Sequence, residues 1–112
     1  MIESQKISGV IFLGEQDGQV ERELKAALAD FLPVHRTISL VYLARVSYRE
    51  TPGSGVALCL RGGSEDAPVL VAGIGEVFKK LFNPTQHLDI LFLSDSQVSE
   101  LERVAKPFYT VP

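Results

Sequence analysis

The alternation of apolar and polar positions along the chain predicts four strands and three helices. Short runs rich in β-branched and aromatic residues have the length of strands. They cover Ile7–Gly14, Ile38–Tyr48, Val56–Arg61 and His87–Leu93. The segment "RETPGSG" between the second and third runs contains proline and glycine in a pattern typical of turns, so these two runs are expected to form a hairpin.

Two segments repeat apolar residues at helical spacing. The first lies between Asp17 and Pro33, and its apolar stripe consists of Val20, Leu24, Ala27, Leu28 and Phe31. The second covers 69–82, with Leu70, Ile74, Val77, Phe78 and Leu81. It contains Gly73 and Gly75, which each cost roughly 1 kcal/mol relative to alanine inside a helix. We therefore expect this helix to pack closely on the sheet.

A third, shorter helix is predicted after the last strand. Ser94 and Gln97 have the spacing of a capping box, in which each residue satisfies the backbone N–H of the other. Pro107 must end the helix because proline lacks a backbone N–H donor. Two aromatic residues, Phe108 and Tyr109, follow in the closing segment "KPFYTVP".

The order β-α-β-β-α-β predicts the α+β class and a ferredoxin-like sandwich, with an added C-terminal helix and aromatic tail. In that fold the sheet has the strand order 4-1-3-2 and carries both long helices on one face. The other face is expected to display mostly apolar side chains, among them Val41, Leu43, Cys59 and Leu91, with Asp89 on the same face. Because such a face is too apolar to remain in water, we expect something to cover it.

Length and charge narrow the class of protein. The 112 residues fit a single domain, residues 1–112. A formal net charge of -3 with interspersed signs leaves no basic stripe for phosphates, which argues against nucleic acid as a partner. No apolar run approaches the roughly 20 residues that a membrane span needs, and the start lacks the pattern of a secretory leader. These features favour a cytoplasmic protein that does not enter a membrane.

The sequence contains a few candidate residues for catalysis or metal binding, but none of them belongs to a complete motif. His87 and Asp89 would share one face of a strand, but the pattern supplies no third ligand, and we interpret them as a polar fringe. Cys59 is the one cysteine, and no neighbouring residue lowers its pKa, so we interpret it as a packed thiol. The sequence therefore favours a protein that is no enzyme and has no cofactor.

The aromatic tail has two interpretations. Burial of a ring contributes about 1.5 to 3 kcal/mol, enough to hold a chain terminus against the sheet or its edge. Phe108 and Tyr109 would then be packed structure. The alternative is a peptide-like recognition element for a partner, because exposed aromatic residues at a terminus usually have a use.

Three segments together resemble the C-terminal domain of the SseB family, the bacterial enhanced serine sensitivity proteins. They are "LVYLARV", "LDILFLSD" and the closing "KPFY". The resemblance implies a cytoplasmic bacterial protein linked by name to serine tolerance, without an established reaction. It implies a shared structural or binding role for Asp89, Pro107, Phe108 and Tyr109. Members of the family usually carry a further N-terminal domain.

Two functions follow as hypotheses. The first is a non-enzymatic domain that binds a protein or self-associates into a homo-oligomer, with Leu43, Asp89, Phe108 and Tyr109 as candidate interaction residues. The alternative is an amino-acid sensor. Its ligand loop would include Gly14, Asp17 and Gly18 at the start of the first helix, where free backbone N–H groups favour a carboxylate.

Overall fold

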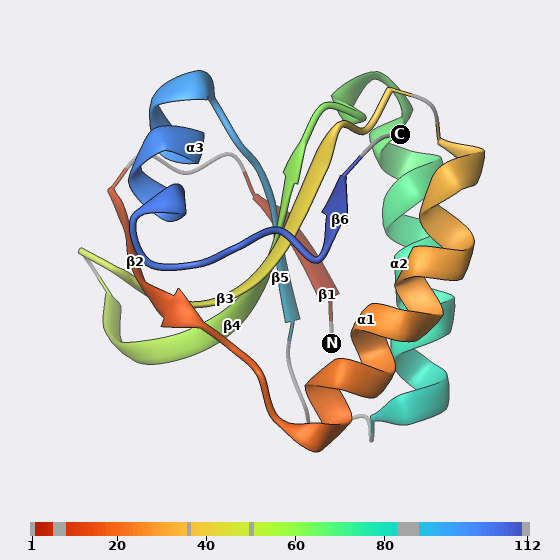
Figure 1. Ribbon diagram of the computed structural model, residues 1–112, viewed down its shortest axis with the longest axis horizontal. Helices are drawn as coiled ribbons and strands as arrows, with labels where there is room; N and C mark the ends of the chain where they lie inside the picture. The colour runs from red at the N-terminus through yellow and green to blue at the C-terminus, as the bar shows by residue number, and fades with distance from the viewer. Residues whose placement is uncertain (1, 6–8, 36, 50, 83–87, 111–112) are drawn as a thin grey trace.

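The computed structural model describes residues 2–5, 9–35, 37–49, 51–82 and 88–110, and shows one twisted sheet with helices on both faces (Figure 1). The strands are β1 Ile2–Gln5, β2 Val10–Glu15, β3 Leu40–Tyr48, β4 Thr51–Arg61, β5 Leu88–Phe92 and β6 Tyr109–Thr110. The helices are α1 Gln19–Phe31, α2 Ala67–Leu81 and α3 Asp95–Glu102, with short 3-10 turns η1 Leu32–Val34 and η2 Ser64–Asp66. Within the described residues, no helix is both long and apolar enough to cross a membrane.

The α+β class is confirmed, but the sheet does not have the ferredoxin-like strand order. Its order is β1-β5-β4-β3-β2, and β6 pairs with β3. In the predicted order the first long strand, β2, would lie inside the sheet, whereas it is the end strand and pairs antiparallel with β3. The physical reason is that α1 joins two antiparallel neighbours, so only α2, between the parallel neighbours β4 and β5, forms a β-α-β crossover.

Two short strands were not predicted from the pattern. The strand β1 pairs parallel with β5, from Ile2 opposite Leu88. The strand β6 pairs antiparallel with β3, where Val41 lies opposite Tyr109. Since β4 occupies the other edge of β3, β6 and β2 share the remaining edge, one at each end of β3. This pairing confirms that the aromatic tail is packed structure at the edge of the sheet.

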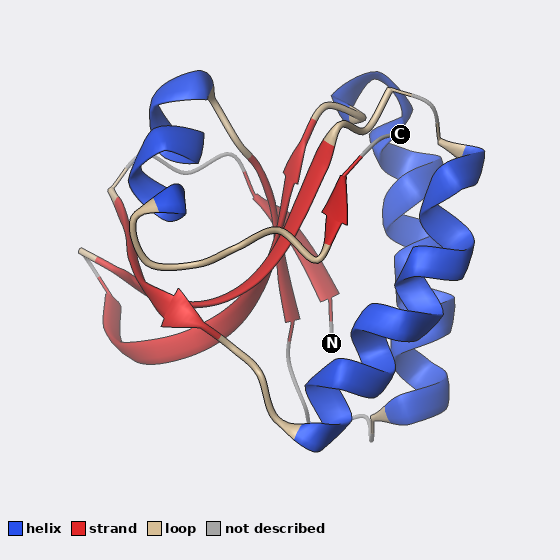
Figure 2. Ribbon diagram, in the orientation of Figure 1, coloured by secondary structure: helices blue, strands red, loops and turns tan. Residues whose placement is uncertain are grey.

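The helices α1 and α2 cover one face of the sheet (Figure 2). The apolar stripes predicted from the sequence supply most of the helical part of this core, but Val20 of the first stripe is exposed. The core also includes the inward-facing residues of β3, β4 and β5. Gly73 serves the contact between the two helices, because a Cβ built on it would lie 2.3 Å from the ring of Phe31 on α1. Close packing at Gly73 is thus against the neighbouring helix and not, as expected, against the sheet.

The helix α3 lies against the opposite face, as the expectation of a cover required. Leu101 and Ala105 join a second core with residues of β2, β3, β4 and β5, including Cys59 and Leu91. The capping box at Ser94 and Gln97 is present: the Gln97 N–H donates to Ser94 Oγ at 3.3 Å, and the Ser94 N–H donates to Gln97 Oε1 at 2.9 Å.

Two predictions about β3 and β4 are wrong. Val41 and Leu43 were expected on the face opposite the two long helices, but they pack in the core beneath α1 and α2. The alternate residues of β3 pack beneath α3, so both faces of this strand are covered. The predicted turn at "PGSG" lies inside β4, which begins at Thr51. The register of the β3–β4 pairing shifts between Ser47 and Tyr48, which indicates a β-bulge. Gly53 has a φ of +90° there, a backbone conformation that glycine adopts without strain.

Candidate functional site

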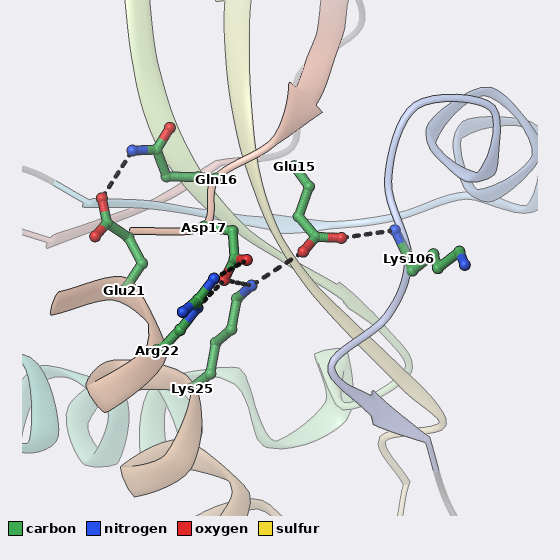
Figure 3. Close-up of polar contacts among 7 residues, drawn as sticks. All are labelled: Glu15, Gln16, Asp17, Glu21, Arg22, Lys25 and Lys106. Atoms are coloured by element: carbon green, nitrogen blue, oxygen red, sulfur yellow. Dashed lines mark hydrogen bonds and ion pairs between the residues drawn. The ribbon is translucent and has the colours of Figure 1, made fainter. Parts of the chain in front are cut away.

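The predicted ligand loop connects β2 to α1 and is rich in charged groups (Figure 3). Gly14 lies in β2 next to a register shift, and Gly18 is the N-cap of α1 without a side-chain cap. The Asp17 carboxylate accepts hydrogen bonds from Arg22 at 3.2 and 3.3 Å and from Lys25 at 3.2 Å. Hydrogen bonds from Arg22 and then Lys25 lower the pKa of Asp17. Its charge is therefore already compensated by α1.

A second carboxylate ties the loop to the C-terminal tail. Glu15 accepts a hydrogen bond from Lys25 Nζ at 3.3 Å and another from the backbone N–H of Lys106 at 3.2 Å (Figure 3). The loop, the helix α1 and the segment before the tail are thus held by one polar network. Surface ion pairs of this kind contribute little to stability, typically about 0 to 1 kcal/mol.

The start of α1 is occupied by a carboxylate of the chain itself. Gln16 Nε2 donates to Glu21 Oε1 at 2.7 Å, and a Cβ built on Gly18 would lie 2.7 Å from Glu21 Oε2. An incoming carboxylate would meet this like charge, so the geometry favours a cationic group here over the carboxylate that the sequence suggested. The missed signal is Glu21 itself, at the third position of the helix, where an acidic side chain commonly folds back onto the N-terminus.

An apolar cavity of about 230 Å³ lies next to this loop. It is lined by Glu21, Leu24, Leu43, Val56, Phe78, Phe82 and Leu88. The rings of Phe78 and Phe82 stack at 4.5 Å between centroids. Among these lining residues only Glu21 is charged, so the cavity combines apolar walls with one carboxylate.

Two of the predicted interaction residues are buried. Leu43 is 1% exposed and lines this cavity, so it is not part of the protein surface. Asp89 is 5% exposed and accepts a hydrogen bond from the Tyr48 hydroxyl at 2.5 Å. His87, which the sequence paired with Asp89, lies outside the described residues.

The surroundings of the Cys59 thiol make it a poor nucleophile. It lies within the core beneath α3, and burial, followed by the charge of Asp89, raises its pKa to about 12. At neutral pH it is therefore protonated, and a thiol is a poor nucleophile. Within the described part of the chain, no group of three or more potential metal-ligating His, Cys, Asp or Glu side chains lies together.

The aromatic tail is committed to the fold. Phe108 and Tyr109 are half-buried and pack against the core under α1 and α2. The Phe108 N–H donates to the Val41 carbonyl at 3.0 Å, and the pairing of Tyr109 with Val41 continues the sheet. The tail residues therefore act first as an edge strand, and their rings are only partly accessible to a partner.

The end strand β2 has two exposed apolar side chains, and their exposure was not predicted from the sequence. Ile11 is 42% exposed and Leu13 is 48% exposed, while Val10 and Phe12 point into the core under α3. A shallow cavity of about 320 Å³ runs beside the first half of the strand, and its charged lining residues are Glu100 of α3, the C-cap residue Arg103 and Arg49 of the β3–β4 hairpin. This surface was not predicted from the sequence because the ferredoxin-like strand order placed β2 in the middle of the sheet.

Comparison of the chain with protein-family models, with curated proteins and with solved structures finds no match.

Proposed function

We propose that the chain is a non-enzymatic, cytoplasmic interaction domain similar to the C-terminal domain of SseB, and that it binds a protein through the edge of β2. The observation that carries the proposal is the exposure of Ile11 and Leu13 on a strand at the end of the sheet. An end strand has unpaired backbone N–H and C=O groups on its outer side, and an extended segment of a partner satisfies them by adding a strand.

The side chains of β2 supply the apolar part of such a contact. Burying a whole leucine or isoleucine side chain contributes about 1.5 to 3 kcal/mol, so covering the exposed half of Ile11 and of Leu13 contributes about 1 kcal/mol each. Natural end strands usually carry charged residues, prolines or covering loops to prevent pairing. The apolar residues on β2 therefore support a surface that a partner covers.

The absence of catalysis is part of the proposal and rests on the state of Cys59. The thiol is buried and its pKa is raised to about 12, so it is not an activated nucleophile. The carboxylates around α1 are engaged by Arg22, Lys25 and Gln16. These contacts support a structural role for the charged loop, and the resemblance to SseB supports a role connected with serine tolerance.

Site-specific photo-cross-linking in bacterial cells tests the interaction surface. A photoreactive amino acid at position 11 is expected to capture a discrete protein, and the same group at position 34 is expected to capture none. Val34 is a matched control because it is 78% exposed and lies in η1, away from β2. The same captured bands at both positions, or none at position 11, would contradict docking through β2.

A second candidate function is the binding of a small molecule in the cavity beside Glu21. Apolar walls with one carboxylate favour an amine with an apolar body, so leucine-like or aromatic amines fit this chemistry better than serine. A ligand at about 100 times its Kd raises the stability of the folded state by about 2.7 kcal/mol. A thermal shift with an apolar amine that Leu43→Phe abolishes would support this function, and no shift with any amino acid or amine would exclude it.

A further inference from the structure

We propose that the partner of β2 is a second copy of this chain, and that the two copies pair β2 against β2 in antiparallel orientation about a two-fold axis. This inference rests on the proposed interaction function and names its partner. The end strand β2 presents Ile11 and Leu13 to solvent, and a second copy presents the same strand. Antiparallel pairing of identical strands is self-complementary, so each contact forms twice.

The charges around β2 are complementary under a two-fold axis. Glu100 of α3 and Arg103, the residue that caps the C-terminus of α3, both line the cavity beside Val10–Phe12, and both are exposed. None of the ion pairs found within the described ranges involves either side chain. A two-fold axis beside β2 turns the α3 helix of one copy toward that of the other, which allows Glu100 of each copy to face Arg103 of its partner.

The two ends of β2 also differ in charge. Glu15 ends the strand, and Arg49 lies beside its beginning, where the Arg49 Cδ is 3.6 Å from a Cβ built on Gly9 and the Arg49 N–H donates to the Gly9 carbonyl at 3.1 Å. Antiparallel pairing brings Glu15 of one copy, which Lys25 and the Lys106 N–H already contact within its own chain, to the Arg49 end of the other. Parallel pairing would bring like charges together, which costs free energy.

The length of the regular edge limits the strength of the dimer. The register of β2 shifts between Phe12 and Gly14, so the unbulged part that can pair is short. An interface built on such a short stretch of strand is small, and small interfaces are typical of weak, concentration-dependent assemblies. We therefore expect monomer at about 10 µM and a rising share of dimer toward about 1 mM when the molar mass is measured by light scattering.

Disulfide cross-linking of single engineered cysteines tests the geometry on the whole chain. Cys59 is buried, so it does not compete with an exposed cysteine. Under mild oxidation, Ile11→Cys is expected to form a covalent dimer at least about ten times faster than Val34→Cys, because a cysteine near the axis meets its own copy. A mixture of Glu15→Cys and Arg49→Cys is expected to cross-link faster than either variant alone.

A charge exchange on α3 provides an independent test that does not touch the core. Arg103→Glu and Glu100→Arg are each expected to weaken dimerisation about three- to tenfold, and the double variant is expected to restore it. Both positions are exposed, so the variants should keep the thermal midpoint of the wild type.

The outcomes separate this inference from the proposed function. Equal cross-linking of Ile11→Cys and Val34→Cys, or a monomer at all concentrations, overturns the pairing of two copies. If position 11 still captures a different protein in cells, docking through β2 stands with another partner. If position 11 captures nothing and the chain remains monomeric, the pairing and the proposed function both fail.

Discussion

The hydroxyl of Tyr48 donates a hydrogen bond of 2.5 Å to the carboxylate of Asp89, linking β3 to β5 across the intervening strand β4. Asp89 is the buried charged residue of the described chain, with 5% of its surface exposed. A buried carboxylate requires hydrogen-bond donors, since leaving one unsatisfied costs several times more than a neutral hydrogen bond gains. The Asp89 position in "LDILFL" is therefore structural.

Tyr48→Phe is expected to destabilise the fold because it removes a donor from Asp89 without changing the packed volume. The expected loss in the free energy of unfolding is about 1 to 3 kcal/mol, a fall in Tm of several degrees. Urea or thermal unfolding measures it. Tyr109→Phe is the control, because Tyr109 is half-buried at the edge of the sheet. Equal effects of the two variants would show that the Tyr48 hydroxyl is not a special donor.

Gly73→Ala is expected to destabilise the fold, although alanine is the better helix former by about 1 kcal/mol. A Cβ at this position would lie 2.3 and 2.6 Å from ring atoms of Phe31, closer than any real contact permits. Phe31→Leu in the same chain should relieve the clash, so the double variant should be more stable than the sum of the two single effects predicts. Additive effects in thermal unfolding would contradict the close contact.

The helices were predictable because each carries its signal within a short stretch of sequence. Leu24 and Leu28 of α1, and Leu70, Ile74 and Phe78 of α2, follow the helical period and are buried as that period requires. The capping box of α3 is equally local. Such features depend on neighbours three or four residues away, so a single sequence contains them in full.

The strand order was not predictable from the same pattern, because pairing depends on distant segments. Alternation along β3 separates Val41 and Leu43 from Tyr42 and Ala44, but both sets are apolar. Nothing local decides which set meets the helix pair, and the structure buries both. The error in strand order then concealed the candidate interaction surface, since it placed β2 in the middle of the sheet, whereas β2 is an end strand on which Ile11 is 42% exposed.

The stability of the protein is expected to fall in alkaline solution partly through Cys59. Its pKa is raised from 9.0 to about 12 in the folded state, so the unfolded chain loses the proton first. The stabilising contribution of the protonated thiol is complete below about pH 9 and declines as pH rises toward 12. Between about pH 8 and pH 10 the wild type should lose about 1 kcal/mol more than Cys59→Ala in urea unfolding. Parallel losses in the two proteins would exclude this contribution.

Phe108→Ala separates the structural role of the tail from a role in recognition. The ring packs on the core under α1 and α2, and the Phe108 N–H bonds to Val41, so truncation should remove packing and loosen the edge of β3. Because the ring is half-buried, we expect the free energy of unfolding to fall by about 1 to 2 kcal/mol. The control is the dimer cross-linking rate of Ile11→Cys under conditions in which both proteins are folded, and this rate should not change. If Phe108→Ala instead abolished cross-linking while the thermal midpoint stayed constant, the tail would be a recognition element, and the partner surface would have to include the β6 end of β3 as well as β2.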